Sequence, residues 1–131
     1  MYHERVMAKL DRCGRDFSCW NNVESQFNSL SYFWDAAIIN EGDIFGYMEY
    51  MIEHRPDLEA IGAVGCLAAI DKLMPFFQEQ QKLESDSAKM DYWQRTRHER
   101  RSAEGLAEDV NDFGRLLLRF AEENASRLGT D

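Results

Sequence analysis

The chain has 131 residues, of which 44% are hydrophobic and 30% charged, with a net charge of −9 and an isoelectric point of about 4.8. This hydrophobic content excludes a disordered chain, and the length predicts a single domain over residues 1–131. The negative charge argues against direct binding to nucleic acid, where affinity comes mainly from Lys and Arg on phosphates.

Cysteine usage and the lack of a long apolar run both predict a cytoplasmic protein. Cys13, Cys19 and Cys66 make an odd number without a Cys-x-x-Cys spacing, which fits a reducing compartment. The N-terminal 13 residues lack the apolar segment of a signal peptide. The longest apolar run, residues 60–70, is too short for a bilayer, which needs about 20 residues. No membrane association is therefore expected.

In chain order, the first predicted helix covers residues 2–12 and ends before Gly14. The next helix is predicted to begin near Trp20 and to stop at Asn40. Its apolar residues recur every three or four positions, which is typical of one helix face. They are Trp20, Val23, Phe27, Leu30, Trp34 and Ala37.

A junction separates this helix from a second one over residues 44–52. Asn40 and Gly42 are predicted to end the first helix, and Asp43 to cap the second, which places Gly46 inside a helix. Neither an EF-hand nor a phosphate-binding loop fits the spacing of this junction.

Residues 57–80 predict a central helix that is apolar on most sides. Asp57 is its expected N-cap, and small residues between 62 and 69 would let neighbouring helices approach closely. Pro75 should kink or shorten its last turn. The residues expected in the core are Val64, Leu67, Ile70, Phe27, Trp34, Leu106, Phe113 and Leu117.

The polar residues 81–103 predict a short helix with part of the segment in a loop. A last helix is predicted from Leu106 to Phe120, with Gly129 after its end. The expected fold class is therefore all-α, a compact bundle of about five or six helices with a central apolar helix near residues 57–80.

No residue pattern supports a metal site, a cofactor or catalysis. The three histidines lack partners at zinc-ligand spacing, and motifs for an activated nucleophile are absent. A small-ligand-binding or enzymatic domain stays open as an alternative, with a site between helices near Asn40, Asp43 and Tyr47.

Charged residues cluster in ways that suggest surfaces. Residues 95–101 are basic and follow two aromatic residues, a combination that can bind nucleic acid, but a solvated face paired to nearby acids is favoured. Within residues 104–112, carboxylates spaced four apart would share one face of a continuous helix, and residues 49–53 repeat this spacing. Such a row can imitate a phosphate backbone, although from the pattern alone an ordinary solvated face is favoured. The candidate partner-binding residues are Glu49, Glu53, Glu104, Glu108, Asp109 and Asp112.

Three segments carry a family resemblance. They are the turn Asn40–Phe45, the segment Leu58–Ala63 that opens a helix of small residues, and the closing segment 106–128. Together they resemble a family of bacterial all-helical domains of unknown function that includes a DNA-mimic protein. The resemblance implies a helical fold and, from that one member, an acidic protein that occupies the DNA-binding surface of basic proteins.

The leading hypothesis is therefore a non-enzymatic acidic interaction protein, a DNA mimic whose partner is a basic DNA-binding protein or transcription regulator. A partner protein of the toxin-immunity type is a further alternative. A homodimer is also compatible with the sequence.

Overall fold

The computed structural model describes residues 1–40, 43–108 and 110–131, and these residues form helices without a strand. The predicted all-α class is confirmed. None of the described helices combines the length and the hydropathy needed to span a bilayer. The α-helices are α1 (Tyr2–Arg12), α2 (Asn22–Phe33), α3 (Met48–Glu53), α4 (Arg55–Ile61), α5 (Val64–Gln81), α6 (Asp86–Ala107) and α7 (Val110–Glu123).

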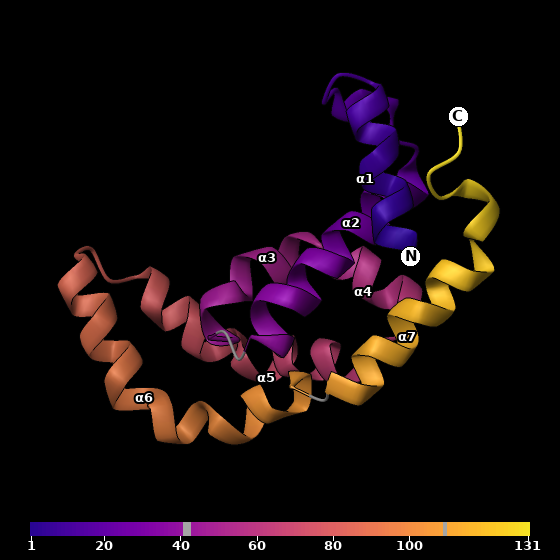
Figure 1. Ribbon diagram of the computed structural model, residues 1–131. Helices are drawn as coiled ribbons and strands as arrows, with labels where there is room; N and C mark the ends of the chain where they lie inside the picture. The colour runs from indigo at the N-terminus through magenta and orange to yellow at the C-terminus, as the bar shows by residue number, and fades with distance from the viewer. Residues whose placement is uncertain (41–42, 109) are drawn as a thin grey trace.

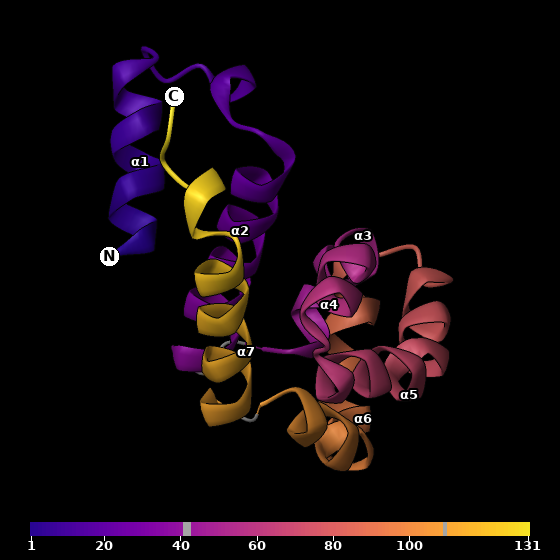
Figure 2. The same ribbon diagram turned by 90° about the vertical axis from the view of Figure 1, so that its right-hand side faces the viewer.

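The helices form two groups that pack against each other (Figures 1 and 2). One group contains α1, α2 and α7, and the other contains α3, α4, α5 and α6. The buried ring of Phe33, at the end of α2, joins them: it lies 5.7 Å from the Phe113 ring of α7 and 6.2 Å from the Tyr50 ring of α3. Aromatic contacts at these distances add to the stabilisation from apolar burial.

The buried carboxylate of Glu24 ties the start of α2 to both ends of the chain. Asn21 and Glu24 form a capping box, each side chain accepting from the other's backbone N–H at 2.9 Å. The Glu24 carboxylate also accepts from the Lys9 ammonium at 2.8 Å and from the Gly129 amide at 2.9 Å. Burial opposes ionisation of Glu24, but these donors outweigh it and hold the pKa of its carboxyl below the ordinary value.

The predicted end of the second helix at Asn40 is confirmed, whereas Gly42, the other predicted end residue, lies outside the described residues, and the predicted cap at Asp43 is wrong. After α2 the chain continues as a π-helical turn, η2 (Trp34–Ile39), and the side chain of Asn40 then donates to the Asp35 carbonyl at 2.7 Å. Asp43 does not cap the following turn η3 (Phe45–Tyr47), which has no side-chain cap. Its carboxylate accepts instead from the indole of Trp93 at 2.8 Å, so it is used to hold α6.

The apolar helix predicted near residues 57–80 is present but divided at Gly62. This glycine has a φ of +73°, a left-handed conformation that ends α4 before α5 begins. Asp57 lies in the first turn of α4, whose N-cap is His54, so the predicted cap is displaced. Pro75 lies inside α5, which continues to Gln81 and is not shortened there.

The division at Gly62 explains one of the two differences in burial, and the position of the α6 end explains the other. Val64 was expected in the core but is 70% exposed, because it is the first residue of a new helix. Leu106 is 38% exposed and belongs to α6, not to the last helix. The other expected core residues are buried or packed against the core: Phe27, Ile70, Phe113 and Leu117 are buried, and Trp34 and Leu67 are partly buried.

Helices α5 and α6 approach closely at a glycine. A Cβ atom built on Gly65 would lie 2.2 Å from the backbone oxygen of Leu106, far inside any real contact. Gly65 therefore has the packing role that was predicted for the small residues of this segment. Helix α6 itself is longer than predicted, since it covers most of residues 81–103 and begins with a side-chain cap from Ser85 to the Ala88 amide at 3.0 Å.

Substitution of Gly65 by Ala should separate α5 from α6. We expect Gly65→Ala to lower the free energy of unfolding by about 1–3 kcal/mol, because overpacking outweighs the gain in helix propensity. Gly105→Ala in α6 is the matched control, since a Cβ there meets nothing within 4 Å, and it should be neutral or stabilising by up to about 1 kcal/mol. Urea unfolding of both variants measures the difference. Equal effects at the two positions would contradict the close approach.

Candidate functional site

The predicted acidic residues of α3 lie on a firmly held helix face. Met48 and Met51 are fully buried and fix one side of α3 in the core. Glu49 and Glu53 are exposed on the other side, one turn apart, and neither forms an ion pair with any residue that the structure describes. Their negative charges are therefore available to a partner.

The second predicted acidic row is interrupted. Helix α6 ends at Ala107, and Glu108 follows it as the C-cap residue. Glu104, Glu108 and Asp112 therefore do not share one helix face, and the prediction of a continuous row is wrong. Asp109 lies outside the described residues. A break of this kind between two apolar stripes cannot be recognised from spacing alone, because the stripes on both sides remain in helical register.

Two acids of this second set have arginine partners. Glu104 is paired with Arg100, one turn earlier in α6, and only 17% of its side chain is exposed. Burial raises the pKa of the Glu104 carboxyl, while the Arg100 guanidinium opposes that rise. Asp112 accepts from Arg115 at 2.6 Å. Among the members of this set that the structure describes, Glu108 alone resembles the exposed acids of α3.

The basic segment 95–101 is only in part the solvated face, paired to nearby acids, that was favoured from the sequence: Arg95 is exposed and paired with Asp91 at 2.9 Å, but Arg100 is buried. Arg100 has no exposed surface, and its guanidinium donates to Thr96 Oγ1 at 3.0 Å and to the Trp93 carbonyl at 2.7 Å. It also lies over the ring of Phe45, 4.3 Å from the centroid. This cation–π contact and the Glu104 pair explain how an arginine is accommodated without solvent. Arg97 and Arg101 remain exposed.

The two acidic sets lie apart in the fold. In Figures 1 and 2, α3 is on one side of α5, and the junction of α6 with α7 is on the other side. Glu104 and Glu108 also border a hollow on α6. The basic residues that line this hollow are Arg97, His98 and Arg101. Among the predicted residues that the structure describes, Glu49 and Glu53 are therefore the only pair that combines exposure, close spacing and distance from these arginines.

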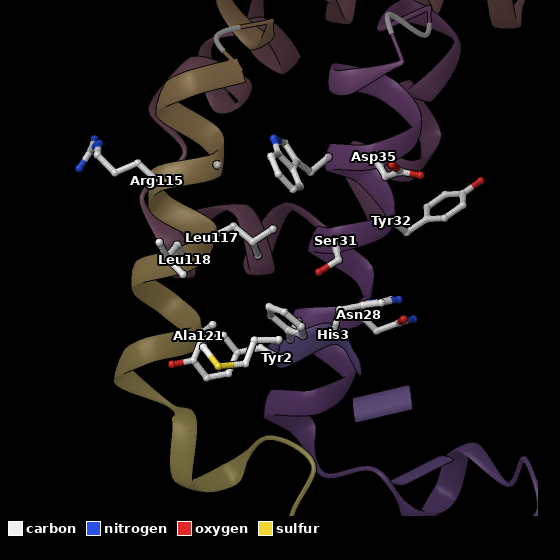
Figure 3. A pocket seen from close by; sticks show the side chains of 14 residues that line it. Tyr2, His3, Asn28, Ser31, Tyr32, Asp35, Arg115, Leu117, Leu118 and Ala121 are labelled. Atoms are coloured by element: carbon white, nitrogen blue, oxygen red, sulfur yellow. The ribbon is translucent and has the colours of Figure 1, made fainter. Parts of the chain in front are cut away.

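A groove that the sequence did not predict lies between α2 and α7 (Figure 3). It has a volume of about 810 Å³, which is within the range of ligand-binding clefts. Figure 3 shows Ser31 of α2 and Leu117 of α7 pointing toward each other across it, with Tyr2 and Ala121 at one end. Leu118 and Tyr32 on its rim are 52% and 53% exposed.

Trp34 and Gly114 also line this groove. A Cβ on Gly114 would lie 3.1 Å from the Trp34 ring, so the glycine lets the indole pack against α7. The Trp34 Nε1 atom is buried and has no hydrogen-bond partner among the described residues, although buried donors are usually paired. Trp34 begins the π-helical turn η2, and such turns are frequent at functional sites. The periodicity of the sequence predicted that Trp34 lies on the apolar face of a helix, but it could not predict that its indole lines a groove.

The residues proposed for a ligand site near the junction are engaged elsewhere. The Asn40 amide is bonded to the Asp35 carbonyl, the Asp43 carboxylate to Trp93, and the Tyr47 ring packs edge-on against Phe33 at 6.2 Å. Within the described residues, no group of three or more His, Cys, Asp or Glu side chains is arranged to hold a metal ion.

Comparison with known proteins returns no match. No family model matches the chain, and no curated protein and no solved structure is significantly similar to it. The resemblance carried by residues 40–45 and 58–63 therefore stays a prediction.

Arg100 should be essential to stability, whereas its neighbour Arg101 should not. We expect Arg100→Met to cost about 3–5 kcal/mol, because it leaves the Glu104 carboxylate half-buried without its partner. Arg101→Met removes the same charge from an exposed position and should change stability by less than about 0.5 kcal/mol. Chemical unfolding followed by circular dichroism compares the two. Similar losses for both variants would show that Arg100 is not a special anchor.

Proposed function

We propose that this protein is a non-enzymatic, acidic interaction protein that binds a basic partner through α3. The observation that carries the proposal is the exposed pair Glu49 and Glu53, which has no ion pair among the described residues and sits on a helix fixed by buried methionines. Because the backbone of α3 is already held in the core, only the two glutamate side chains lose conformational freedom when a cationic surface binds them.

The net negative charge of the whole chain adds a long-range attraction to the short-range contacts of Glu49 and Glu53. A charge of −9 attracts basic proteins and raises their association rate, and salt weakens the attraction. The partner class that we propose is a basic DNA-binding protein, such as a transcription regulator, in which the acidic face takes the place of DNA. This part rests on the sequence resemblance. A cytoplasmic location belongs to the same proposal and is supported by the free thiols.

Neutralising the α3 pair should weaken partner binding. In capture experiments from a bacterial lysate at low salt, we expect Glu49→Gln with Glu53→Gln to reduce recovery of basic proteins by up to about tenfold, since each exposed ion pair contributes up to about 1 kcal/mol. Duplex DNA added in competition should release the captured protein, and so should high salt. Quantitative mass spectrometry measures the recovered proteins.

The matched control removes the same charge elsewhere. Glu84→Gln with Glu122→Gln changes two other exposed carboxylates that have no ion pair with a described residue, and it should bind as well as the unmodified chain. Equal weakening by both double variants would mean that net charge alone acts. Recovery of no basic protein, or of one that neither salt nor DNA displaces, would contradict the proposal.

A second candidate function is supported by the groove between α2 and α7. Its walls are mainly apolar and aromatic, its volume of about 810 Å³ suits a small organic molecule, and the Ser31 hydroxyl faces into it. The ligand class that fits is an apolar organic molecule with a hydrogen-bond donor or acceptor for that hydroxyl.

A fluorescent apolar anion, anilinonaphthalene sulfonate, can test the groove. We expect Ser31→Phe to fill the space and to weaken binding of this probe about tenfold or more, with unchanged near-ultraviolet circular dichroism. Ser102→Phe adds the same ring at an exposed position on α6 and should bind the probe like the unmodified chain. If both variants bind equally well, the groove is not the site of binding.

A further inference from the structure

The hollow on α6 has a volume of about 520 Å³ and lies on the solvent side of the helix. The residues that line it are Gln94, Arg97, His98, Arg101, Glu104 and Glu108. Helix α6 runs along the edge of the molecule, so the hollow is open to small molecules (Figure 1). It shares no residue with the α3 pair or with the groove between α2 and α7.

The two arginines of the hollow differ from most arginines of the chain because they lack a carboxylate partner. Acidic residues outnumber Lys and Arg by 24 to 15, and most exposed arginines are accordingly paired. The paired ones are Arg12, Arg15, Arg55, Arg95, Arg115 and Arg119. Arg97 and Arg101 form no ion pair with any residue that the structure describes, although Glu108 lines the same hollow. Two guanidinium groups therefore remain available to an anion.

Arg97 is held in position by an aromatic ring. Its guanidinium lies over the Trp93 ring, 5.3 Å from the centroid, and the buried Arg100 lies 5.6 Å from the same centroid. The Trp93 indole donates to the Asp43 carboxylate at 2.8 Å, which fixes the ring. Arg97 therefore loses less conformational freedom when an anion binds than a freely rotating arginine would.

The spacing of the donors suits one tetrahedral anion. Arg97 and Arg101 are one helical turn apart, so their side chains lie on the same face of α6. Each guanidinium presents parallel N–H groups, and a phosphate monoester offers three terminal oxygens with a charge of about −1.5 to −2. The Gln94 amide and the His98 ring add N–H donors to the same hollow. A carboxylate has only two oxygens and one charge, so it would use fewer of these donors.

The acids toward the C-terminal end of α6 restrict the size of the ligand. Glu104 is already paired with Arg100, which leaves the Glu108 carboxylate to face a bound molecule. A polyanion such as a nucleic acid would bring further phosphates toward Glu108, and like charges repel. Glu99 does not line the hollow, because residues two apart on a helix face different sides.

We propose that the hollow on α6 binds the phosphate group of a small phosphomonoester, with Arg97 and Arg101 donating to the phosphate oxygens. The organic part lies toward Glu108, whose carboxylate accepts from its hydroxyl groups. A sugar phosphate combines one phosphate with several hydroxyls in this way. The net charge of −9 opposes binding, but salt screens distant charges beyond about 10 Å at 0.1 M, so the two nearby arginines dominate.

Ribose 5-phosphate is the probe for this site. It is titrated into the folded chain at constant ionic strength, and amide chemical shifts are followed by nuclear magnetic resonance. We expect saturable shifts in α6 around Arg97 and Arg101, and much weaker binding of ribose. Arg97→Gln with Arg101→Gln should weaken binding of the phosphate about tenfold or more, because both guanidinium groups are lost. Circular dichroism verifies that the variant is folded.

The matched control removes two positive charges elsewhere. Lys72→Gln with Arg127→Gln changes exposed residues that have no ion pair with a described residue, and it should bind ribose 5-phosphate like the unmodified chain. Equal weakening by both double variants, equally tight binding of ribose, or no shift in α6 would overturn the proposal. An RNA oligonucleotide that binds at the same arginines more tightly than ribose 5-phosphate would overturn the restriction to one phosphate group.

Discussion

The buried guanidinium of Arg100 is the interaction on which the position of α6 and the form of the acidic surface depend. It donates to the Trp93 carbonyl and to Thr96, lies over the Phe45 ring and is paired with Glu104. A cation without exposed surface requires such partners, since an unpaired buried charge is strongly unfavourable. Phe45 belongs to the segment that precedes α3, so this one side chain connects α6 with the region that carries the exposed glutamates.

The carboxylates discussed above have two different roles, one in the fold and one on the surface. Glu104 stabilises a buried cation, and Glu24 joins α1 to α2 and to the C-terminal segment through Lys9 and the Gly129 amide. These two carboxylates stabilise the fold, because each is hydrogen bonded to a buried cationic side chain. Glu49 and Glu53 have no such partner among the described residues and remain exposed. A negative net charge does not by itself identify a binding surface. The contrast between the paired acids and the exposed acids Glu49 and Glu53 favours α3 as that surface.

Helical spacing in the sequence was sufficient to predict the fold class and the core residues on long apolar stripes, such as Phe27 and Ile70. It failed where a helix restarts, as at Val64, since the phase of the next helix depends on the left-handed Gly62. It also failed for Arg100, because a charged residue is expected in solvent unless its partners are known. The groove beside Trp34 arises from segments that only the fold brings together.

The central claim is that Glu104 is committed to Arg100 and not to a partner. A double-mutant cycle with Arg100→Met, Glu104→Gln and the combined variant measures the coupling free energy of this pair from urea unfolding. We predict a favourable coupling of about 1–3 kcal/mol, as for residues that share a buried network. A coupling within about 0.3 kcal/mol of zero, which is typical of many exposed ion pairs, would contradict the account and return Glu104 to the set of available surface acids.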